Sequence, residues 1–296
     1  MDHTHYEYSP VAHRPAWALA PGKLIAAYAV LHLEHWELAP PKDALRDPRL
    51  VGEFGSFDPD FRSYTQREYG LRIGIFRVIA ALREAGITPC IAANAMALER
   101  LPNLVRQFND WGCEWIAHGI AATRMMHSKM TLAQQRACID DSAQAVERAC
   151  GKRPAGWLSQ DWGTTPDTFA LLADAGFSYT LDWPNDDQPY WLGTTPALLS
   201  IPMSAEWDDV QCQWLRHIEP RMHAQMVQDA LARMLSECES QATSCVFGLG
   251  IHPWVSGMAS RIAAFAQMLR DARKDDRVCW TSPGQIHAAY CAQVPS

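Results

Sequence analysis

The chain has 296 residues, of which 48% are hydrophobic, so it holds enough apolar material for one large core or two small ones. This composition excludes disorder as the dominant state. Charged residues make up 20% of the chain, and 26 Lys and Arg against 33 Asp and Glu give a formal net charge of -7. A nucleic-acid site needs clustered basic surface, and an acidic balance without runs of Lys or Arg argues against one.

The cysteines and the N-terminus bear on where the protein works. Nine cysteines occur without a CxxC pair, which is more typical of scattered thiols in a reducing compartment than of disulfides or a zinc knuckle. Residues 1–15 lack the apolar stretch of a signal peptide. The longest apolar run, Leu24–Leu33, is about half the ~20 residues that a membrane helix needs. We therefore expect a cytoplasmic protein that binds neither membrane nor nucleic acid.

Short apolar runs alternate with longer helical patterns along the chain. The predicted strands are Leu24–Leu33, Thr88–Ile91, Trp115–Ala117, Tyr179–Leu181, Leu198–Ile201 and Cys245–Ile251. The predicted helices are Tyr69–Ala85, Thr131–Cys150, Pro166–Ala175, Met222–Glu239 and Ser260–Lys274. Such alternation predicts parallel βα units in one α/β domain. Over roughly 250 residues it fits a barrel as well as an open sheet.

Two of the helices carry clear start and stop signals. Thr131 is the expected N-cap of the second helix, and Gly151 follows its last residue. Thr165 is the expected N-cap of the third helix, with Pro166 at its first position and Gly176 at its end. These signals place the intervening loops at the ends of the predicted strands.

Polar residues follow several of the predicted strands directly. Glu34 and His35 follow the first strand, His118 the third, Asp182 the fourth and His252 the last. A carboxylate there can act as general base, and a histidine as acid, metal ligand or substrate anchor. A lone histidine is more often structural, but ligand sites gather at the carboxyl ends of parallel strands, where these residues recur.

Other well-known site patterns do not fit. Glycine-rich phosphate loops, a GxSxG nucleophile elbow and an HExxH zinc motif are all absent. A metal hydrolase would need about three converging ligands, which His35, His118 and one of Asp182 or His252 could supply. The sequence permits such a centre without requiring it.

The order of the strand-end residues resembles the polysaccharide deacetylase (NodB-like, carbohydrate esterase 4) superfamily. The superfamily motifs are two adjacent aspartates, a His pair four residues apart, Arg-Pro, Asp-Trp and Leu-x-His. The matching positions are Glu34-His35, His118 with Ala122, Arg153-Pro154, Asp182-Trp183 and, with one residue inserted, Leu249-Gly-Ile-His252. The resemblance spans about residues 20 to 290 and implies a deformed (β/α) barrel. We take residues 1–296 as one such domain, with 1–20 as an N-terminal extension.

The departures from these motifs point to one branch of the superfamily. Glu-His in place of Asp-Asp, and Ala122 in place of the second His, remove two usual metal contacts. The changes resemble the metal-independent allantoinase branch, as does the segment Arg67-Glu-Tyr-Gly70-Leu-Arg-Ile-Gly74. That segment, Leu33-Glu-His-Trp-Glu37 and Leu181-Asp-Trp-Pro-Asn-Asp-Asp-Gln-Pro189 are similar to bacterial cyclic imide hydrolases (imidases).

The resemblance implies a hydrolase that opens a cyclic imide or ureide ring by adding water to a ring carbonyl. Glu34 would be the base, with a pKa raised by apolar surroundings, and His252 and His118 the other catalytic residues. The implied substrate-binding residues are His35, Trp36, Arg67, Arg153, Asp182, Trp183 and Trp254. No cofactor is expected, with zinc on His35 and His118 as the alternative, and a homo-oligomer, dimer or tetramer, is implied.

Other functions stay open at this stage. One is an allantoinase-like ureide hydrolase, and another is a metal-dependent deacetylase of an N-acetylated substrate, which would bind about one zinc ion. A third is a non-enzymatic barrel that binds a purine-derived ligand or a partner subunit, which would leave Glu34, His118 and His252 without a shared task.

Overall fold

A computed structural model describes residues 2–50 and 57–296 of the chain. The strands are β1 (Ile25–Leu33), β2 (Cys90–Ala93), β3 (Trp115–Ala117), β4 (Gly156–Trp157), β5 (Tyr179–Thr180), β6 (Tyr190–Leu192), β7 (Leu198–Ser200), β8 (Cys245–Ile251) and β9 (Val278–Trp280). The helices are α1 (Phe61–Tyr69), α2 (Ile75–Ala85), α3 (Ala95–Arg100), α4 (Pro102–Trp111), α5 (Leu132–Cys150), α6 (Thr168–Asp174), α7 (Pro220–Gln241), α8 (Pro253–Ser256), α9 (Ile262–Ala272) and α10 (Pro283–Cys291).

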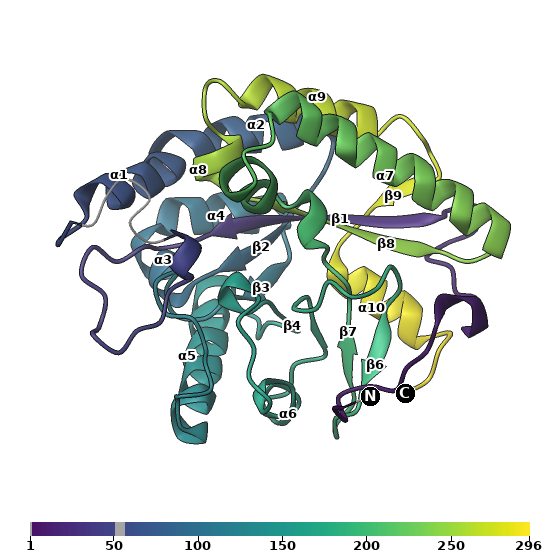
Figure 1. Cartoon of the computed structure of the whole chain (residues 1–296), viewed down its shortest axis with the longest axis horizontal. Helices are drawn as coiled ribbons and strands as arrows, with labels where there is room; N and C mark the ends of the chain where they lie inside the picture. The colour runs from purple at the N-terminus through teal and green to yellow at the C-terminus, as the bar shows by residue number, and fades with distance from the viewer. Residues whose placement is uncertain (1, 51–56) are drawn as a thin grey trace.

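The strands form a single curled sheet in the order β6-β7-β5-β4-β3-β2-β1-β8, with β9 also paired to β1. Among the paired strands of the described residues, β6 and β7 alone are antiparallel. Among the described residues, the end strands β6 and β8 do not pair, so the barrel stays open (Figure 1). This arrangement confirms the predicted α/β fold with a deformed barrel.

Strand β1 lies at the centre of the molecule, and its whole length is buried. Successive side chains of a strand point to opposite faces of the sheet. Ala26, Tyr28 and Val30 contribute to an apolar core inside the barrel. Ile25 and Ala27 contribute to the larger core between the sheet and the helices. A strand buried on both faces reads as one apolar run, as this segment of the sequence does.

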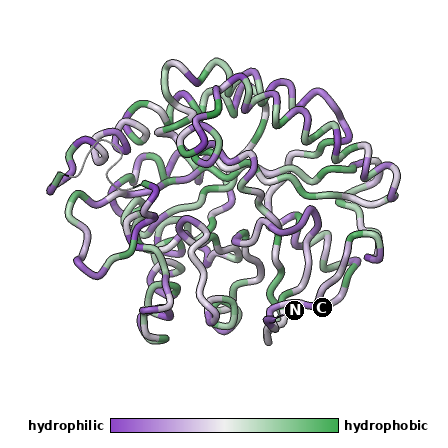
Figure 2. Tube along the Cα trace, in the orientation of Figure 1, coloured by the Kyte–Doolittle hydropathy of each residue, from purple (hydrophilic) through white to green (hydrophobic). Residues whose placement is uncertain are grey.

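The helices cover the outer face of the sheet. In Figure 1, α2, α9 and α7 lie along one side of β1 and β8, while α5 and α6 lie beyond β3 and β4. Trp17 and Tyr290 pack edge to face at 5.5 Å, which ties the N-terminal segment to α10. Figure 2 shows hydrophobic residues along the central strands and hydrophilic ones on the outer turns of the helices.

The local signals of α5 are confirmed. Thr131 accepts a hydrogen bond from the backbone of Gln134, whose side chain bonds back to Thr131, and Gly151 ends the helix in the left-handed region. The predicted start of α6 is wrong, because the helix begins at Thr168 and Thr165 does not cap it. The Thr165 hydroxyl donates to Gln135 on α5 and accepts from the Asp167 backbone, so it joins the loop before α6 to α5.

The pattern predicted as the helix Tyr69–Ala85 belongs to a longer element. This element consists of α1, a π-helical segment at Gly70–Gly74, and α2. The predicted strand at Thr88–Ile91 forms two residues later, as β2. In the part of the chain that the structure describes, no helix is long and apolar enough to span a bilayer.

Candidate functional site

Two polar side chains extend the interior face of β1. His32 and Glu34 follow Val30 at two-residue spacing, so they face the barrel interior at the carboxyl end of the strand. Each has only 6% of its surface exposed. His35 is out of step with this alternation and belongs to the other face.

His118 meets both of these residues from the end of β3. Its Nε2 lies 3.4 Å from Glu34 Oε1 and 3.4 Å from His32 Nδ1. Its Nδ1 lies 2.7 Å from the carbonyl oxygen of Leu158, which can only accept a hydrogen bond. The Gln160 amide donates to the same Glu34 oxygen at 2.8 Å. The carboxylate is therefore held by two groups, one that follows β3 and one that follows β4.

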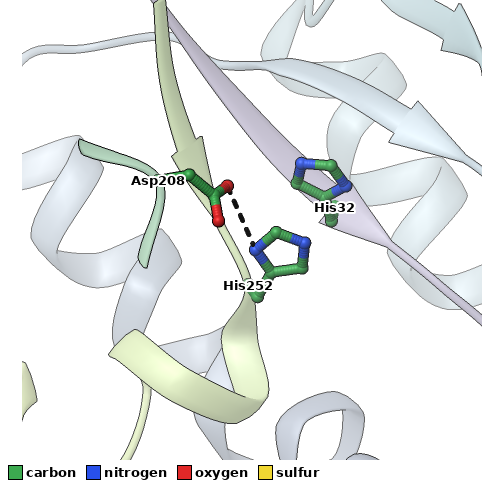
Figure 3. Close-up of side chains that lie close together, drawn as sticks. All are labelled: His32, Asp208 and His252. Carbon is green, nitrogen blue, oxygen red and sulfur yellow. Dashed lines mark ion pairs between the residues drawn. The ribbon is translucent and has the colours of Figure 1, made fainter. Parts of the chain in front are cut away.

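A second cluster lies at the end of β8. The Nδ1 of His252 is 2.7 Å from Asp209 Oδ1, and the Ser256 hydroxyl donates to the other oxygen of Asp209 at 2.6 Å. The His252 ring stacks on His32 at 3.9 Å with an interplanar angle of 15°. Asp208 Oδ2 lies 3.8 Å from His252 Nδ1, as Figure 3 shows. His32 thus joins the two clusters.

A glycine makes room for the acidic pair. A Cβ on Gly250 of β8 would lie 2.2 Å from Asp208 Oδ2, a distance that real Cβ atoms do not adopt. The missing side chain therefore lets the loop after β7 bring Asp208 and Asp209 against β8. Gly250 and His252 share the interior face of this strand, because they are two residues apart.

The charges of this centre shift several pKa values. Burial raises the pKa of Glu34, but the hydrogen bond with His118 and the charge of His252 outweigh burial and hold that pKa well below its usual range. The expectation of a raised Glu34 pKa is therefore wrong. Burial and the charge of His252 hold the pKa of His32 well below normal, which keeps this ring neutral.

The pKa of His252 moves the other way. Burial lowers it, but Asp208 and Asp209 overcome that effect and raise the pKa to about 10. Burial also raises the pKa of Asp208 to about 6. The centre therefore holds a buried imidazolium beside carboxylates, and a neutral imidazole stacked on it.

A small, partly open pocket lies beside these residues. It is lined by His32, Glu34, Trp36, Arg67, Gly70, Leu71, Pro253 and Trp254. The Arg67 guanidinium lies 3.6 Å from the centre of the Trp254 ring and 4.7 Å from that of Trp36. Arg67 is only 2% exposed, so its charge forms a flat, buried part of the wall.

Glycines explain why this wall is so close-packed. A Cβ on Gly70 would lie 2.6 Å from the backbone nitrogen of Trp254, and a Cβ on Gly74 would lie 2.2 Å from the backbone oxygen of Pro253. The π-helical segment therefore contacts α8 backbone to backbone. The two glycines of the segment Arg67-Glu-Tyr-Gly70-Leu-Arg-Ile-Gly74 thus allow it to pack closely against α8, which directly follows His252.

The structure brings together Glu34, His118, His252, Trp36, Arg67 and Trp254 from the predicted set. It places Arg153 elsewhere, because that side chain is exposed, lies before β4 and donates to the Ala175 carbonyl. Trp183 packs edge to face on Phe169 at 4.4 Å and does not line the pocket. The structure therefore places Arg153 and Trp183 away from the lining of this pocket, and their substrate contacts stay a prediction.

Asp182 and His35 have supporting positions. The Asp182 carboxylate is fully buried and accepts hydrogen bonds from Ser159 and Thr180, so it fixes the loop that carries Gln160. His35 does not join the His118 cluster, and its pKa is lowered by burial and by Arg100. Among the described residues, His35 therefore belongs to neither group of side chains that could hold a metal ion.

Sequence reasoning missed His32, Gln160, Asp208 and Asp209. The alternation of β1 could have identified His32, because it is in step with Glu34. Gln160 and the two aspartates lie in loops, and no local pattern places a loop residue beside a distant strand end.

The donor set of this centre does fit a metal ion. Two groups of three side chains have ligand atoms within 4.8 Å of one another: His32, Glu34 and His118, and His32, Asp208 and His252. Imidazole and carboxylate are zinc ligands.

Solved structures share the fold over nearly the whole chain. The PuuE allantoinase superposes with a TM-score of 0.85 and 24% identity, covering 98% of this chain and 100% of that one. A probable polysaccharide deacetylase from Pseudomonas aeruginosa PAO1 gives 0.83 and 24%, covering 96% and 97%. No protein-family model and no curated protein matches the sequence. These likenesses define the class of fold, the deformed barrel of deacetylase and allantoinase structures.

Proposed function

We propose that this protein is a hydrolase that opens a small cyclic imide by adding water to a ring carbonyl. The observation that carries the proposal is the small pocket at the carboxyl end of β1, in which the aromatic side chains of Trp36 and Trp254 lie beside Glu34 and His32.

The unsatisfied donors of the wall match the acceptors of an imide. The indole nitrogens of Trp36 and Trp254 are buried and lack hydrogen-bond partners among the described residues. A buried polar group without a partner costs free energy, which a bound ligand can recover. An imide presents two carbonyl oxygens that accept hydrogen bonds.

The charges of the centre suit both halves of the reaction. Hydrogen bonds to Glu34 within the described chain reach only Oε1, so Oε2 is available to take a proton from the attacking water. His252 is protonated by virtue of Asp208 and Asp209, and it can give a proton to the leaving nitrogen. The second carbonyl of an imide delocalises charge on that nitrogen and makes it a better leaving group.

A metal ion would be held by His32, Glu34 and His118, and there it would polarise a carbonyl and lower the pKa of water. The residues of the chain keep their own tasks in either case. Leu158 and Gln160 orient the ligand groups, Asp209 orients His252, and the tryptophans exclude water and position the ring.

The test compares three kinds of substrate with the purified protein. We expect turnover of succinimide, weaker turnover of the ureide allantoin, and no acetate release from an N-acetylated sugar oligomer. Products are measured by chromatography of the ring-opened acid amide and of acetate. Allantoin turned over faster than succinimide would favour the ureide alternative. Acetate release without ring opening would contradict the proposal and favour a deacetylase.

The role of the pocket wall has its own prediction. Trp254→Phe keeps the aromatic face and removes the N–H donor, so we expect KM for succinimide to rise about 2- to 10-fold with kcat little changed. The matched control is Trp191→Phe, which removes an indole N–H that bonds to the Val294 carbonyl away from the pocket. Equal KM values for Trp254→Phe and the unmodified protein would show that this donor does not bind substrate.

A further inference from the structure

The loop after β4 has an unusual backbone conformation close to the site. Asp161 has a φ of 51° and Trp162 a φ of 53°, so two consecutive residues other than glycine lie in the left-handed region. Such residues cost free energy, and they cluster at active sites and ligand clamps, where the surrounding structure holds them in place. The conformation therefore points to a functional constraint at this turn.

Hydrogen bonds fix the turn and join it to the site. The Trp162 backbone nitrogen donates to the Ser159 carbonyl at 3.2 Å. Gln160, which directly precedes Asp161, donates its side-chain amide to Glu34 Oε1 at 2.8 Å. The main chain that carries Asp161 is thus anchored to the carboxylate at the end of β1.

The Asp161 side chain holds an acceptor that lacks a donor. Its Oδ2 atom is buried and has no hydrogen-bond partner among the described residues. Burial, followed by the charges of Glu34 and Asp47, raises the pKa of Asp161 to about 7, against the opposing effects of His252 and His118. The carboxyl group therefore lies within the electrostatic field of the centre. A buried acceptor in this setting gains free energy from any ligand that donates to it.

Another buried carboxylate oxygen of the centre also lacks a hydrogen bond, but it already faces a cation. Asp208 Oδ2 lies 3.8 Å from the Nδ1 of His252. It also packs against β8, where a Cβ on Gly250 would lie 2.2 Å from it. Asp161 is therefore the stronger candidate for an acceptor that a substrate completes.

The unsatisfied groups around the centre complement the edge of an imide ring. This edge presents a carbonyl, an N–H and a second carbonyl in sequence, so one donor lies between two acceptors. The buried indole nitrogens of Trp36 and Trp254 are donors without partners among the described residues, and Asp161 supplies an acceptor. The site thus offers both kinds of group that such an edge needs.

We propose that Asp161 accepts a hydrogen bond from the ring N–H of the substrate and so makes the site specific for rings whose nitrogen carries a hydrogen. The N–H lies in the plane of the ring, so the face of the nitrogen stays free to receive the proton of His252. Asp161 does not line the pocket of Trp36 and Trp254, and it approaches from the loop after β4. The inference deepens the proposed function and rests on it for the identity of the ring.

The test compares a ring that has an N–H with the same ring without it. Succinimide and N-methylsuccinimide differ at this position, and kcat/KM is measured for both with the full chain. A site built to bond a substrate N–H rejects an analogue that lacks it, so we expect succinimide to be preferred by at least about 100-fold.

Two variants of Asp161 separate recognition from bulk. Asp161→Gly removes the carboxyl group and suits the left-handed backbone. We expect kcat/KM for succinimide to fall about 10- to 100-fold, and kcat/KM for N-methylsuccinimide not to fall. Asp161→Asn keeps a carbonyl oxygen that can accept, and Asn tolerates the left-handed region, so part of the preference should return. A purely structural role would lower both substrates equally.

Asp167→Asn is the matched control. Asp167 is exposed, lies just before α6 in the same loop, and does not cap that helix with its side chain. Both kcat/KM values should equal those of the unmodified protein. Circular dichroism checks that each variant is folded.

Binding without turnover separates this inference from the proposed function. In Glu34→Gln protein, calorimetry measures Kd for both rings, with and without the added Asp161→Gly change. We expect tighter binding of succinimide than of N-methylsuccinimide, and loss of that difference when Asp161 is replaced.

Two results would overturn the inference: equal losses for the two rings in Asp161→Gly, or a preference that this change leaves intact. Either result, with succinimide still opened, would leave the proposed function standing. A binding preference that depends on Asp161, in a protein that opens no ring, would support the recognition and contradict the proposed function. No binding of either ring would overturn both.

Discussion

His32 and Glu34 show how much a two-residue spacing decides in this molecule. Both face the barrel interior, while His35, next in sequence, belongs to the other face of the sheet. The carboxylate then contacts His118 and Gln160, and the imidazole stacks on His252. Two neighbouring residues of the chain, Glu34 and His35, therefore have different surroundings: the first lies in the site and the second lies outside it.

The role of Glu34 predicts a large loss on substitution. Glu34→Gln keeps the size of the side chain but cannot take up a proton, so we expect kcat for imide opening to fall about 10²- to 10⁴-fold. Steady-state kinetics on succinimide measure the effect. Glu37→Gln, on the same loop and paired with Arg124, is the matched control. Turnover within a few-fold of normal in a folded Glu34→Gln protein would remove Glu34 from the mechanism.

Asp182 predicts a pH-dependent contribution to stability. Burial raises its pKa to about 6, against the hydrogen bonds from Ser159 and Thr180 that lower it. The pKa of Asp182 in the folded protein exceeds the ordinary value of 3.8. Its stabilising contribution to the free energy of unfolding is therefore fully present below about pH 3.8. It is lost as the pH rises through about 6.

Asn at this position has no charge to bury. The free energy of unfolding of Asp182→Asn minus that of the unmodified protein should therefore rise between about pH 4 and 6, by up to ~3 kcal/mol. Urea unfolding at several pH values measures this difference. A difference that stays constant across the range would show that Asp182 keeps an ordinary pKa.

At the scale of elements, the contact between α8 and the π-helical segment Gly70–Gly74 shapes the pocket. The helical pattern of the sequence is correct for α2, but it does not show that the helix bulges at Gly70–Gly74. The bulge lies where Trp254 and Pro253 approach most closely. π-Bulges are frequent at functional sites, and this one places Arg67 on the Trp254 ring.

This contact predicts the effect of one added methyl group. Gly74→Ala would place a Cβ 2.2 Å from the Pro253 carbonyl oxygen, so α8 must shift. We expect a loss of about 1–3 kcal/mol in the free energy of unfolding and reduced turnover, as for other overpacked contacts. Thermal unfolding and kinetics measure both. Ile73→Ala, at an exposed neighbour, should change neither strongly, and an unaffected Gly74→Ala protein would contradict the account.

The whole molecule is built without disulfides, and its thiols differ in access. All nine cysteines are free, and Cys138, Cys150, Cys279 and Cys291 are only partly buried. We expect Ellman's reagent to titrate nine thiols in denaturant, and at most these four rapidly in the native protein. A reducing agent should leave the melting temperature unchanged. Fewer than nine thiols in denaturant without reductant would indicate a disulfide.

The sequence alone predicted the barrel class and three polar residues that the structure brings together. The fold of the PuuE allantoinase and of the Pseudomonas aeruginosa structure matches the predicted barrel. Glu34, His118 and His252 were found because parallel strands bring their carboxyl ends to one edge, whatever the details of packing. Periodicity and capping are local, so they also located α5 and most of the strands.

Tertiary structure decided what those three residues touch. Asp208 and Asp209 reach His252 only because Gly250 leaves space for the loop after β7. Arg153 and Trp183 lie in matching sequence motifs, yet they pack elsewhere. Long-range loop paths and the choice between two faces of a strand depend on how the whole barrel packs. For that reason Gln160, Asp208 and Asp209 emerge as partners of the site only from the folded molecule.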